Sequence, residues 1–520
     1  MSETYYITTA IFYPNAEPHI GSALEVIGAD VAARYRRLCG EEVFYQTGMD
    51  EHGEKIQKRA EERGVDPKTH TDEMAEKFRR TFDALDISCD NFIRTTSDEH
   101  KIATREILRR CHENGDIYKG HYEGWYCYRC ERFFPANQLN DDKTCPDHGE
   151  KLSLLNEEAY FFKLNEYADK LLAFYEEHPG FIVPESRMNE MKSFVKGGLD
   201  PLCISRTSIH WGIPLPMEEG HVIYVWFDAL TNYLTGVGFG RDEETFNKWW
   251  PADDHIIGKD IVRFHCVIWP AMLMSAGIAL PKRVVGHGFV NLRTTAADGS
   301  EQEVKISKSI LRINAEDVAA QYGPDALRYF LMREVPFTGD GLYSEAGLVQ
   351  RFNSDLANDL GNLLHRTLTM IEKYSDGVAP EPGAEGDLEA ELKRTVVDVV
   401  ARVDPLIRHF NLKEALETAW EVVTAANVYI EKNEPWRMAK DPEQADRLKT
   451  VLYSMAEATR IVMTLVYPYM PRATKAMSEQ LGLDTFPGTL PDAAEWGQLA
   501  PGTKVAKGDP VFPRIDTKNK

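Results

Sequence analysis

The first fifty residues contain a strand pattern, a helix pattern and a second strand pattern in succession, and few folds combine these elements at such short spacing. Residues 5–9 are aromatic and β-branched, which is typical of a strand. After a loop with two prolines, apolar residues recur every three or four positions from Leu24 to Leu38, which predicts one face of a helix that ends at Gly40. Residues 43–46 read as the next strand. A strand, a helix and a strand at this spacing predict an α/β fold with a Rossmann-type parallel sheet.

The α/β pattern is interrupted and then resumes. Residues 116–220 hold a Cys/His cluster and many aromatics, and we interpret them as an insertion. Residues 222–226, 255–258 and 284–286 each read as the end of a buried strand, whereas the signal from about residue 346 onward is helical. The predicted domains are the first half of the Rossmann domain (1–115), a connective insertion (116–220), the second half (221–345), and a helical domain with a C-terminal tail (346–520).

Composition narrows the class of protein further. With 520 residues, 43% of them hydrophobic and 27% charged, the chain is expected to be globular. A net charge of -22 argues against bulk binding of nucleic-acid phosphates but leaves room for a local RNA site. The longest uncharged apolar run, Cys266–Leu280, contains a proline and is shorter than the roughly 18 residues of a membrane span. No membrane contact is predicted, and without a signal-peptide pattern at the N-terminus we expect a cytoplasmic protein.

The strongest single motif is Cys127-x-x-Cys130 followed by Cys145-x-x-His148. Two residues between ligands let both side chains of a knuckle reach one ion, and two such half-sites complete the tetrahedron of a structural Zn²⁺. We therefore predict one structural zinc ion within the insertion. The remaining five cysteines are scattered, and we interpret them as reduced thiols.

Two shorter motifs suit phosphate binding. Pro18–Gly21 lies where the first helix begins, so His19 could donate to phosphate oxygens beside the positive end of the helix dipole, and Gly21 would let a flat base approach the backbone. Lys305 and Lys308 are three positions apart and could clamp a polyphosphate leaving group. Either motif alone is equally typical of solvated surface.

Taken together, these motifs resemble the two signatures of class I aminoacyl-tRNA synthetases, and further stretches narrow the resemblance to the methionyl-tRNA synthetase family. The match runs from about residue 4 to about residue 470 and keeps the order and spacing of unrelated motifs. The stretches that carry it, besides the zinc knuckle, are residues 10–15, 47–53, 224–229, 258–265 and 433–436.

The resemblance implies activation of methionine with ATP and Mg²⁺ to methionyl-adenylate and pyrophosphate, followed by transfer to the 3′ end of tRNA(Met). This chemistry needs positioning and charge stabilisation rather than a protein nucleophile. The implied catalytic residues are His19, Lys305 and Lys308, and the implied ATP-binding residues also include Gly21, Gly258, Asp260 and Ser307. The implied methionine-binding residues are Ile11, Tyr13, Asp50, Trp226, Ala229, Leu230, Tyr233, Phe264 and His265, with Asp50 as the partner of the ammonium group. Without the resemblance, Trp226 and Phe264 would read as core residues.

The helical part would then be the anticodon-binding domain. Asn362 and Arg366 are four residues apart and so share one helix face, and with Trp436 they match the family's anticodon readers. An isolated Asn/Arg pair of this kind is otherwise typical of a solvated helix face.

The chain departs from the family at several points. Ser22 stands where the class usually has a second histidine, Ile306 stands where methionine is usual, and residues 294–303 read as an extra hairpin. The sequence ends soon after the helical domain, and we expect a monomer. Two alternative functions stay open at this stage: a nucleotidyltransferase that uses no tRNA, and a non-enzymatic zinc-bearing RNA-binding protein.

Overall fold

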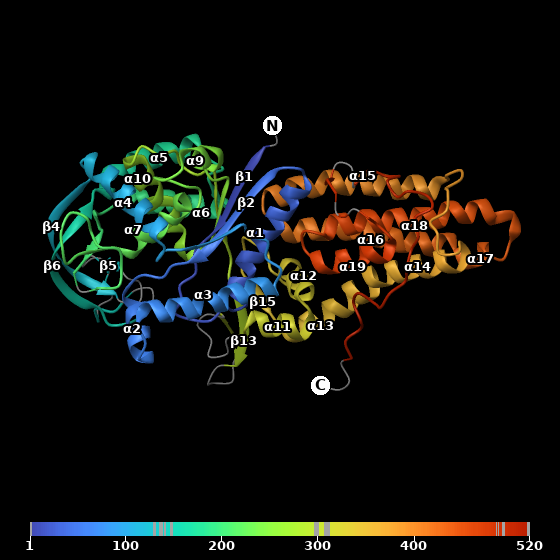
Figure 1. Cartoon of the computed structure of the whole chain (residues 1–520), viewed down its shortest axis with the longest axis horizontal. Helices are drawn as coiled ribbons and strands as arrows, with labels where there is room; N and C mark the ends of the chain where they lie inside the picture. The colour runs from blue at the N-terminus through green and yellow to red at the C-terminus, as the bar shows by residue number, and fades with distance from the viewer. Residues whose placement is uncertain are drawn as a thin grey trace.

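The computed structural model describes residues 3–127, 132–134, 139, 142–145, 149–207, 209–295, 301–305, 313–484, 486, 488–490 and 494–516. Figure 1 shows three parts side by side: a lobe with the long strands β4 (Ile117–Cys127) and β6 (Ser153–Phe162) at one end, an α/β body in the middle, and a bundle of long helices at the other end.

Six parallel strands form the central sheet, in the order β3-β2-β1-β11-β12-β7. Their bounds are β1 (Thr4–Thr9), β2 (Glu42–Met49), β3 (Asn91–Arg94), β7 (Ile182–Val183), β11 (Asp254–Gly258) and β12 (Val284–His287). All of β11 and all but the first residue of β1 are buried, which explains their continuous apolar runs. The predicted Rossmann-type sheet is confirmed. The strand order reverses between β1 and β11, and ligands of such sheets bind at the carboxyl ends of the strands beside that point.

Two segments differ from the sequence predictions. β7 belongs to the range 116–220 but pairs with β12 at the edge of the central sheet. The predicted strand at 222–226 is wrong in its second half, because only Val222–Ile223 (β10) is extended. It pairs with β9 (Ser205–Arg206) outside the central sheet, and helix α7 (Val225–Leu230) follows at once. A short apolar run cannot distinguish a buried strand from a buried helix.

Helices cover the sheet and connect its strands. α1 (Ile20–Leu38) joins β1 to β2, and α3 (Pro67–Ala84) begins where the Asp66 carboxylate accepts a hydrogen bond from the Thr69 amide at 2.9 Å. The other elements of this body are α2 (Glu54–Arg63), α4 (Asp98–Glu113), α8 (Asn232–Thr235), α9 (Glu243–Trp249), α10 (Trp269–Ser275), the 3₁₀ turn η3 (Lys259–Ile261) and the π-helical turn η4 (Phe264–Ile268).

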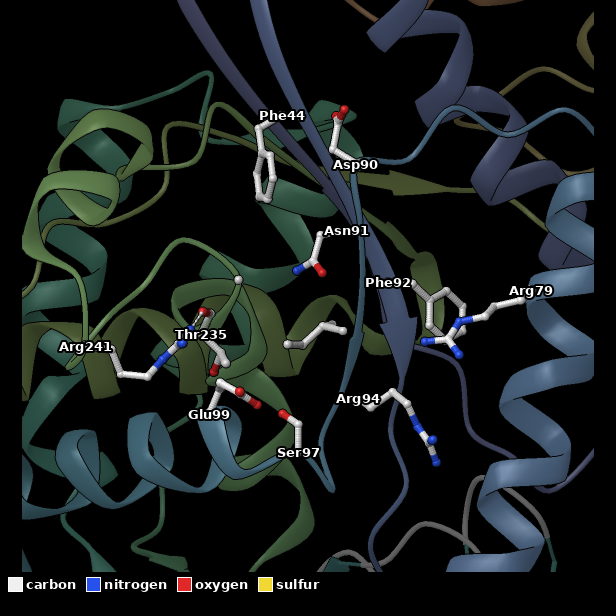
Figure 2. Close-up of a pocket in the computed structure, with 12 residues that line it drawn as sticks. Phe44, Arg79, Asp90, Asn91, Phe92, Arg94, Ser97, Glu99, Thr235 and Arg241 are labelled. Atoms are coloured by element: carbon white, nitrogen blue, oxygen red, sulfur yellow. Dashed lines mark hydrogen bonds between the residues drawn. The ribbon is translucent and has the colours of Figure 1, made fainter.

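A cavity of about 480 Å³ opens beside the edge strand β3. Figure 2 shows Arg94 and Phe92 of β3 on one side of it and Thr235 and Arg241 on the other. None of the site residues predicted from the sequence lines this cavity. Two of its arginines already have partners, because Arg94 pairs with Glu51 and Arg241 donates to the Thr235 carbonyl.

The lobe is an antiparallel sheet in the order β5-β4-β6-β8, with β5 (Arg132–Phe134) and β8 (Leu202–Cys203) at its edges. The turn η2 (Leu164–Tyr167), α5 (Ala168–Glu177) and α6 (Glu185–Lys196) follow β6. Further along the chain, β13 (Val290–Thr295) and β14 (Glu301–Lys305) form the two arms of the expected hairpin, whose tip lies outside the described residues. β15 (Gly341–Tyr343), α11 (Ala315–Tyr322) and α12 (Pro324–Glu334) lead to the bundle.

The predicted helical C-terminal domain is confirmed. Its elements are α13 (Glu345–Arg351), η6 (Phe352–Gly361), α14 (Asn362–Tyr374), α15 (Asp387–Arg408), α16 (Leu412–Asn433), α17 (Pro435–Met438), η7 (Pro442–Gln444), α18 (Ala445–Val466) and α19 (Pro471–Leu481). The apolar repeat of four at residues 348–360 falls on α13 and η6, and η6 is a π-helix. A repeat of four exceeds the 3.6 residues of an α-helical turn, which suits the wider π-helical winding.

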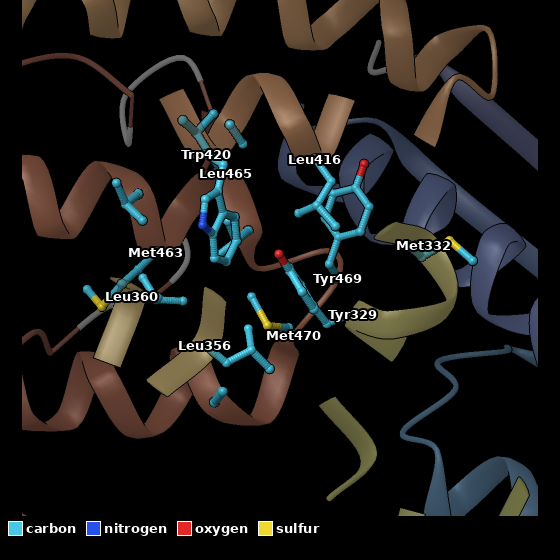
Figure 3. Close-up of a cluster of buried hydrophobic side chains, with 14 of the residues drawn as sticks. Tyr329, Met332, Leu356, Leu360, Leu416, Trp420, Met463, Leu465, Tyr469 and Met470 are labelled. Atoms are coloured by element: carbon cyan, nitrogen blue, oxygen red, sulfur yellow. The ribbon is translucent and has the colours of Figure 1, made fainter. Parts of the chain in front are cut away.

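The bundle and the α/β body share one apolar core. Figure 3 shows α12 residues Tyr329 and Met332 among Leu416, Trp420 and Tyr469 of the bundle. At the same junction the buried Arg328 donates to Asp30 of α1 at 2.7 Å and to the carbonyls of residues 468 and 469. Within the described residues, no helix combines the length and the apolarity that crossing a membrane would require.

Candidate functional site

Helix α1 begins after the loop that follows the carboxyl end of β1. His19 is the N-cap residue, and its Nδ1 accepts a hydrogen bond from the Gly21 amide at 3.0 Å. In the neutral ring the proton is therefore on Nε2, which can donate to an anion. Ser22 closes a capping box, because its hydroxyl accepts from the His19 amide and donates to the His19 carbonyl. The serine that replaces the usual histidine thus has a structural use here.

The loop between β1 and α1 is anchored from outside. His70 of α3 donates through Nε2 to the Pro14 carbonyl at 2.8 Å, and Arg63 donates to Nδ1 of the same ring at 2.6 Å. Burial lowers the pKa of His70, which agrees with a neutral ring between these two partners. The loop that carries Ile11 and Tyr13 therefore reaches His19 along a defined path.

Gly258 and Asp260 lie at the carboxyl end of β11, next to the switch point. Gly258 is buried, and a methyl group on its Cα would come within 2.7 Å of Asp260 Oδ1, so a larger residue there would displace the Asp260 carboxylate. Asp260 is exposed at the rim. A buried glycine and an exposed carboxylate therefore lie close together at the carboxyl end of β11.

A buried pair beside Gly258 was not predicted from the sequence. His287 Nε2 lies 2.8 Å from Glu25 Oε2, and His287 Nδ1 donates to the Gly288 carbonyl at 2.7 Å. Burial raises the pKa of Glu25, while the Glu25 carboxylate raises the pKa of His287 against the opposing effect of burial. The signal available in the sequence was an acidic residue on the apolar face of the first helix, six positions after His19.

The lysine motif falls at the limit of the described residues. Lys305 ends β14, and its backbone pairs with Asn291 of β13. Ser307, Lys308 and Ile306 lie outside the described residues. The backbone of residue 313, which follows this segment, accepts a hydrogen bond from the Ile20 amide at the start of α1. Both phosphate motifs therefore lead to the same end of α1.

The structure brings several predicted methionine-binding residues together. The Trp226 and Phe264 rings stack with centroids 3.7 Å apart and an interplanar angle of 9°. The Tyr233 hydroxyl donates to His265 Nε2 at 2.7 Å, since His265 Nδ1 donates to the Ile261 carbonyl. Burial lowers the pKa of His265 to about 4, so the ring is neutral.

The remaining members of that set lie on α7, after β2 and in the loop after β1. Ala229 and Leu230 are buried on or beside α7, and Asp50 is buried at the carboxyl end of β2. Ile11 and Tyr13 are half-buried in the loop after β1, and the Tyr13 hydroxyl donates to the His52 carbonyl at 2.9 Å. The set thus combines aromatic and apolar side chains with one buried carboxylate.

The predicted zinc ligands are described only in part. Cys127, at the end of β4, and Cys145 are both buried in one small cluster with Leu152. Two backbone hydrogen bonds, from the Gly149 amide to the Cys145 carbonyl and from the Cys145 amide to the Glu150 carbonyl, connect Cys145 with residues 149 and 150. Cys130 and His148 lie outside the described residues, and within the described residues no group of three or more potential metal ligands is present. Two buried sulfurs in a cluster with little apolar core fit a structural metal.

The predicted anticodon readers lie at the far end of the bundle. Asn362 is exposed at the start of α14, and Arg366 follows one turn later. The Arg366 guanidinium lies 5.7 Å from the centre of the half-buried Trp436 ring on α17 and pairs with Glu431 at 2.7 Å. An exposed amide, a guanidinium and an indole on one surface can hydrogen-bond and stack with unpaired bases.

Comparison with known proteins covers the whole chain. The family model described as "tRNA synthetases class I (M)" matches residues 5–153 and 142–368, and "Anticodon binding domain of methionyl tRNA ligase" matches residues 379–520. The methionine–tRNA ligase of Caldanaerobacter subterraneus subsp. tengcongensis is 47% identical over 100% of this chain and 80% of its own length, and that of Clostridium tetani is 46% identical over 100% and 79%. The structure of Mycobacterium tuberculosis methionyl-tRNA synthetase in complex with methionyl-adenylate superposes with a TM-score of 0.92 at 43% identity, covering 98% of this chain and 100% of that one.

Proposed function

This chain belongs to the methionyl-tRNA synthetase family, and we propose that the residues gathered at the carboxyl ends of β1, β2 and β11 form its methionine-activating site. It is an ATP-dependent methionine–tRNA ligase: it converts methionine and ATP to methionyl-adenylate and pyrophosphate and then transfers methionine to the 3′ end of tRNA. The observation that carries the proposal for the site is that residues as far apart in sequence as His19, Asp50 and Phe264 lie on elements converging at this edge.

In the first step the methionine carboxylate attacks the α-phosphorus of ATP, and pyrophosphate leaves. His19 would donate through Nε2 to phosphate oxygens, aided by the positive end of α1. Lys305, Ser307 and Lys308 would stabilise the charge that develops on the leaving pyrophosphate, with Mg²⁺ bound to ATP. Gly21 and Gly258 would lie against the adenosine, and Asp260 would bind its ribose.

Methionine would be selected by an apolar and aromatic surface for its side chain, by neutral polar groups, and by one carboxylate for its ammonium group. The stacked Trp226 and Phe264 rings, with Ile11, Ala229 and Leu230, provide apolar surface for the side chain, and sulfur–aromatic contacts contribute roughly 0.3–1.5 kcal/mol each. Tyr13, Tyr233 and the neutral His265 add polar edges without a net charge. Asp50 would pair with the ammonium group.

Asn362, Arg366 and Trp436 would read the anticodon of tRNA(Met), which would explain how a chain of net charge -22 binds RNA through a local site. Cys127, Cys130, Cys145 and His148 would hold one structural zinc ion, which would stabilise the lobe of the insertion and take no part in the reaction. We further propose the domain bounds 1–115, 116–220, 221–345 and 346–520, a monomer in solution, and a cytoplasmic location.

The experiment that tests the proposal separates the two half-reactions. ATP–pyrophosphate exchange with a panel of amino acids should respond to methionine alone. Trp436→Ala should leave methionine-dependent exchange near wild type, because this step needs no tRNA. Aminoacylation efficiency should fall by about tenfold to a hundredfold, since stacking on a base contributes about 1–3 kcal/mol.

A matched control distinguishes stacking from packing. Trp496 is also half-buried in the helical domain with a cation over its ring, Lys393 at 5.4 Å. Trp496→Ala should affect both half-reactions equally and only through stability. Equal loss in both reactions with Trp436→Ala, tracking its melting temperature, would refute the anticodon assignment.

A further inference from the structure

A fully buried carboxylate lies between two histidines behind the proposed methionine site. Asp228 of α7 accepts a hydrogen bond from His100 Nε2 at 2.7 Å and from His52 Nδ1 at 2.7 Å. The Asp228 and His100 side chains are 0% exposed, and that of His52 is 5% exposed. These contacts hold the pKa of Asp228 at about 2 although burial alone would raise it, so the carboxylate is ionised.

This carboxylate connects elements that are far apart in the sequence. Asp228 sits between Trp226 and Ala229 on α7, while His52 follows Asp50 by two residues. His100 belongs to α4, and its Nδ1 lies 3.0 Å from the hydroxyl of Thr235 at the end of α8. Helix α7 and the loop with the proposed ammonium partner are therefore joined through one group.

The loop around His52 is held on its other side as well. The Glu51 carboxylate accepts from Arg94 Nε at 2.6 Å, and the Glu51 amide donates to Thr95 Oγ1 at 2.9 Å. Trp211 Nε1 donates to the Glu51 carbonyl at 2.6 Å. These contacts hold the loop of residues 50–52 in place. The hydrogen bond from His52 to Asp228 therefore sets the position of α7 relative to Asp50.

We propose that Asp228 is a positioning residue for methionine: through His52 and His100 it fixes α7 against the Asp50 loop, so that the stacked aromatic rings and the carboxylate face the same substrate. The inference rests on the proposed methionine pocket. Asp228 itself is buried behind the pocket, so its effect on the substrate is indirect. Loss of the carboxylate should misplace the two halves of the methionine site and leave the ATP motifs at His19 and Gly258 unchanged.

The test uses ATP–pyrophosphate exchange on the full chain with methionine and ATP varied separately. Asp228→Asn should raise the KM for methionine by about tenfold, the factor expected when a buried hydrogen bond to a charged group is lost. The KM for ATP should stay within about twofold. His52→Leu should also raise the methionine KM, and the double variant should be no worse than Asp228→Asn alone, because that change already removes the contact with His52.

A control separates positioning from general destabilisation. Glu457 in the helical domain is also a 0% exposed carboxylate, bonded to Arg460 and to the amides of residues 497–499. Glu457→Gln should lower the melting temperature without changing the methionine KM. If Asp228→Asn lowered the melting temperature as this control does and left the methionine KM unchanged, or if the KM values of both substrates rose equally, the positioning role would be refuted.

One further variant tells failure of this role from failure of the pocket. Asp50→Asn changes the proposed ammonium partner itself. An unchanged methionine KM in Asp50→Asn would overturn the pocket assignment and this inference together. A raised methionine KM in Asp50→Asn with an unchanged one in Asp228→Asn would overturn the positioning role alone.

Discussion

Asp325→Asn should stabilise the protein at neutral pH. Asp325 lies in the first turn of α12, only 5% exposed, and its Oδ2 accepts a hydrogen bond from the Ala473 amide of α19 at 2.5 Å. Its Oδ1 is buried and makes no hydrogen bond within the described residues. Burial raises the pKa of this carboxyl group from 3.8 to about 6.

The sign of the effect follows from proton binding. Between about pH 4 and pH 6 the folded protein binds this proton more tightly than the unfolded chain does, so the free energy of unfolding decreases as the pH rises through this interval. The difference between 3.8 and about 6 corresponds to roughly 3 kcal/mol at neutral pH. An asparagine keeps the acceptor for Ala473 but buries an amide N–H without a partner, which costs about 1–2 kcal/mol. We expect a net gain of about 1–2 kcal/mol at pH 7.5 and none at pH 4.

The assay is thermal unfolding of wild type and variant across this pH range. Asp98→Asn is the matched control, because Asp98 also occupies the first turn of a helix, α4, but its side chain is 91% exposed. The control should show little change at either pH. A lower melting temperature for Asp325→Asn at pH 7.5, or a difference from wild type that did not grow between pH 4 and 7.5, would refute the reasoning.

Three further predictions concern the catalytic and metal sites. Lys308→Ala should slow adenylate formation by roughly two to three orders of magnitude in single turnover while methionine affinity stays nearly intact, because its contact is made in the transition state; an unchanged rate would exclude it. Ser22→Ala should cost about 1 kcal/mol and raise the KM for ATP, since the hydroxyl holds the His19 turn; a normal ATP KM would show that the capping box does not shape the site. Metal analysis should find one zinc per wild-type chain and none in Cys130→Ser, whose insertion should unfold at lower temperature; wild-type protein without zinc would contradict the motif.

The sequence predicted those elements whose local apolar pattern is typical of one type of secondary structure. β1, β11, β12 and the second half of β2 are buried, and their apolar runs with the turn residues that bound them indicate parallel strands. Helix α1 was equally clear from its repeat and from Gly40 at its end. β7 has only two residues and gains its place by pairing with β12, which no local pattern records.

The residues of the candidate site also fall into two groups, those that the sequence could predict and those that it could not. Residues in contiguous motifs, such as His19 with Gly21 or Trp226 with Ala229, could be named in advance because their spacing matches a family. Pairs joined only by the fold could not: Glu25 meets His287 across 262 positions, and Asp228 meets His52 across 176. A buried charged residue in an apolar segment was the sole hint, since such a group is retained only with a partner.

Helix α1 connects the proposed ATP site to the helical bundle. His19 caps its first turn at the proposed ATP site, and Asp30, about 16 Å further along the helix, accepts hydrogen bonds from Arg34 and from Arg328 at 2.7 Å each. Arg328 in turn donates to the carbonyls of residues 468 and 469, between the bundle helices α18 and α19. Arg328 and Asp30 are both fully buried, and removing either partner would leave an uncompensated buried charge at a cost of about 3–5 kcal/mol. The pair therefore favours one arrangement of the bundle against α1. The proposed anticodon readers near Trp436 would therefore lie at a set distance from His19, as a single tRNA bound at both proposed sites would require.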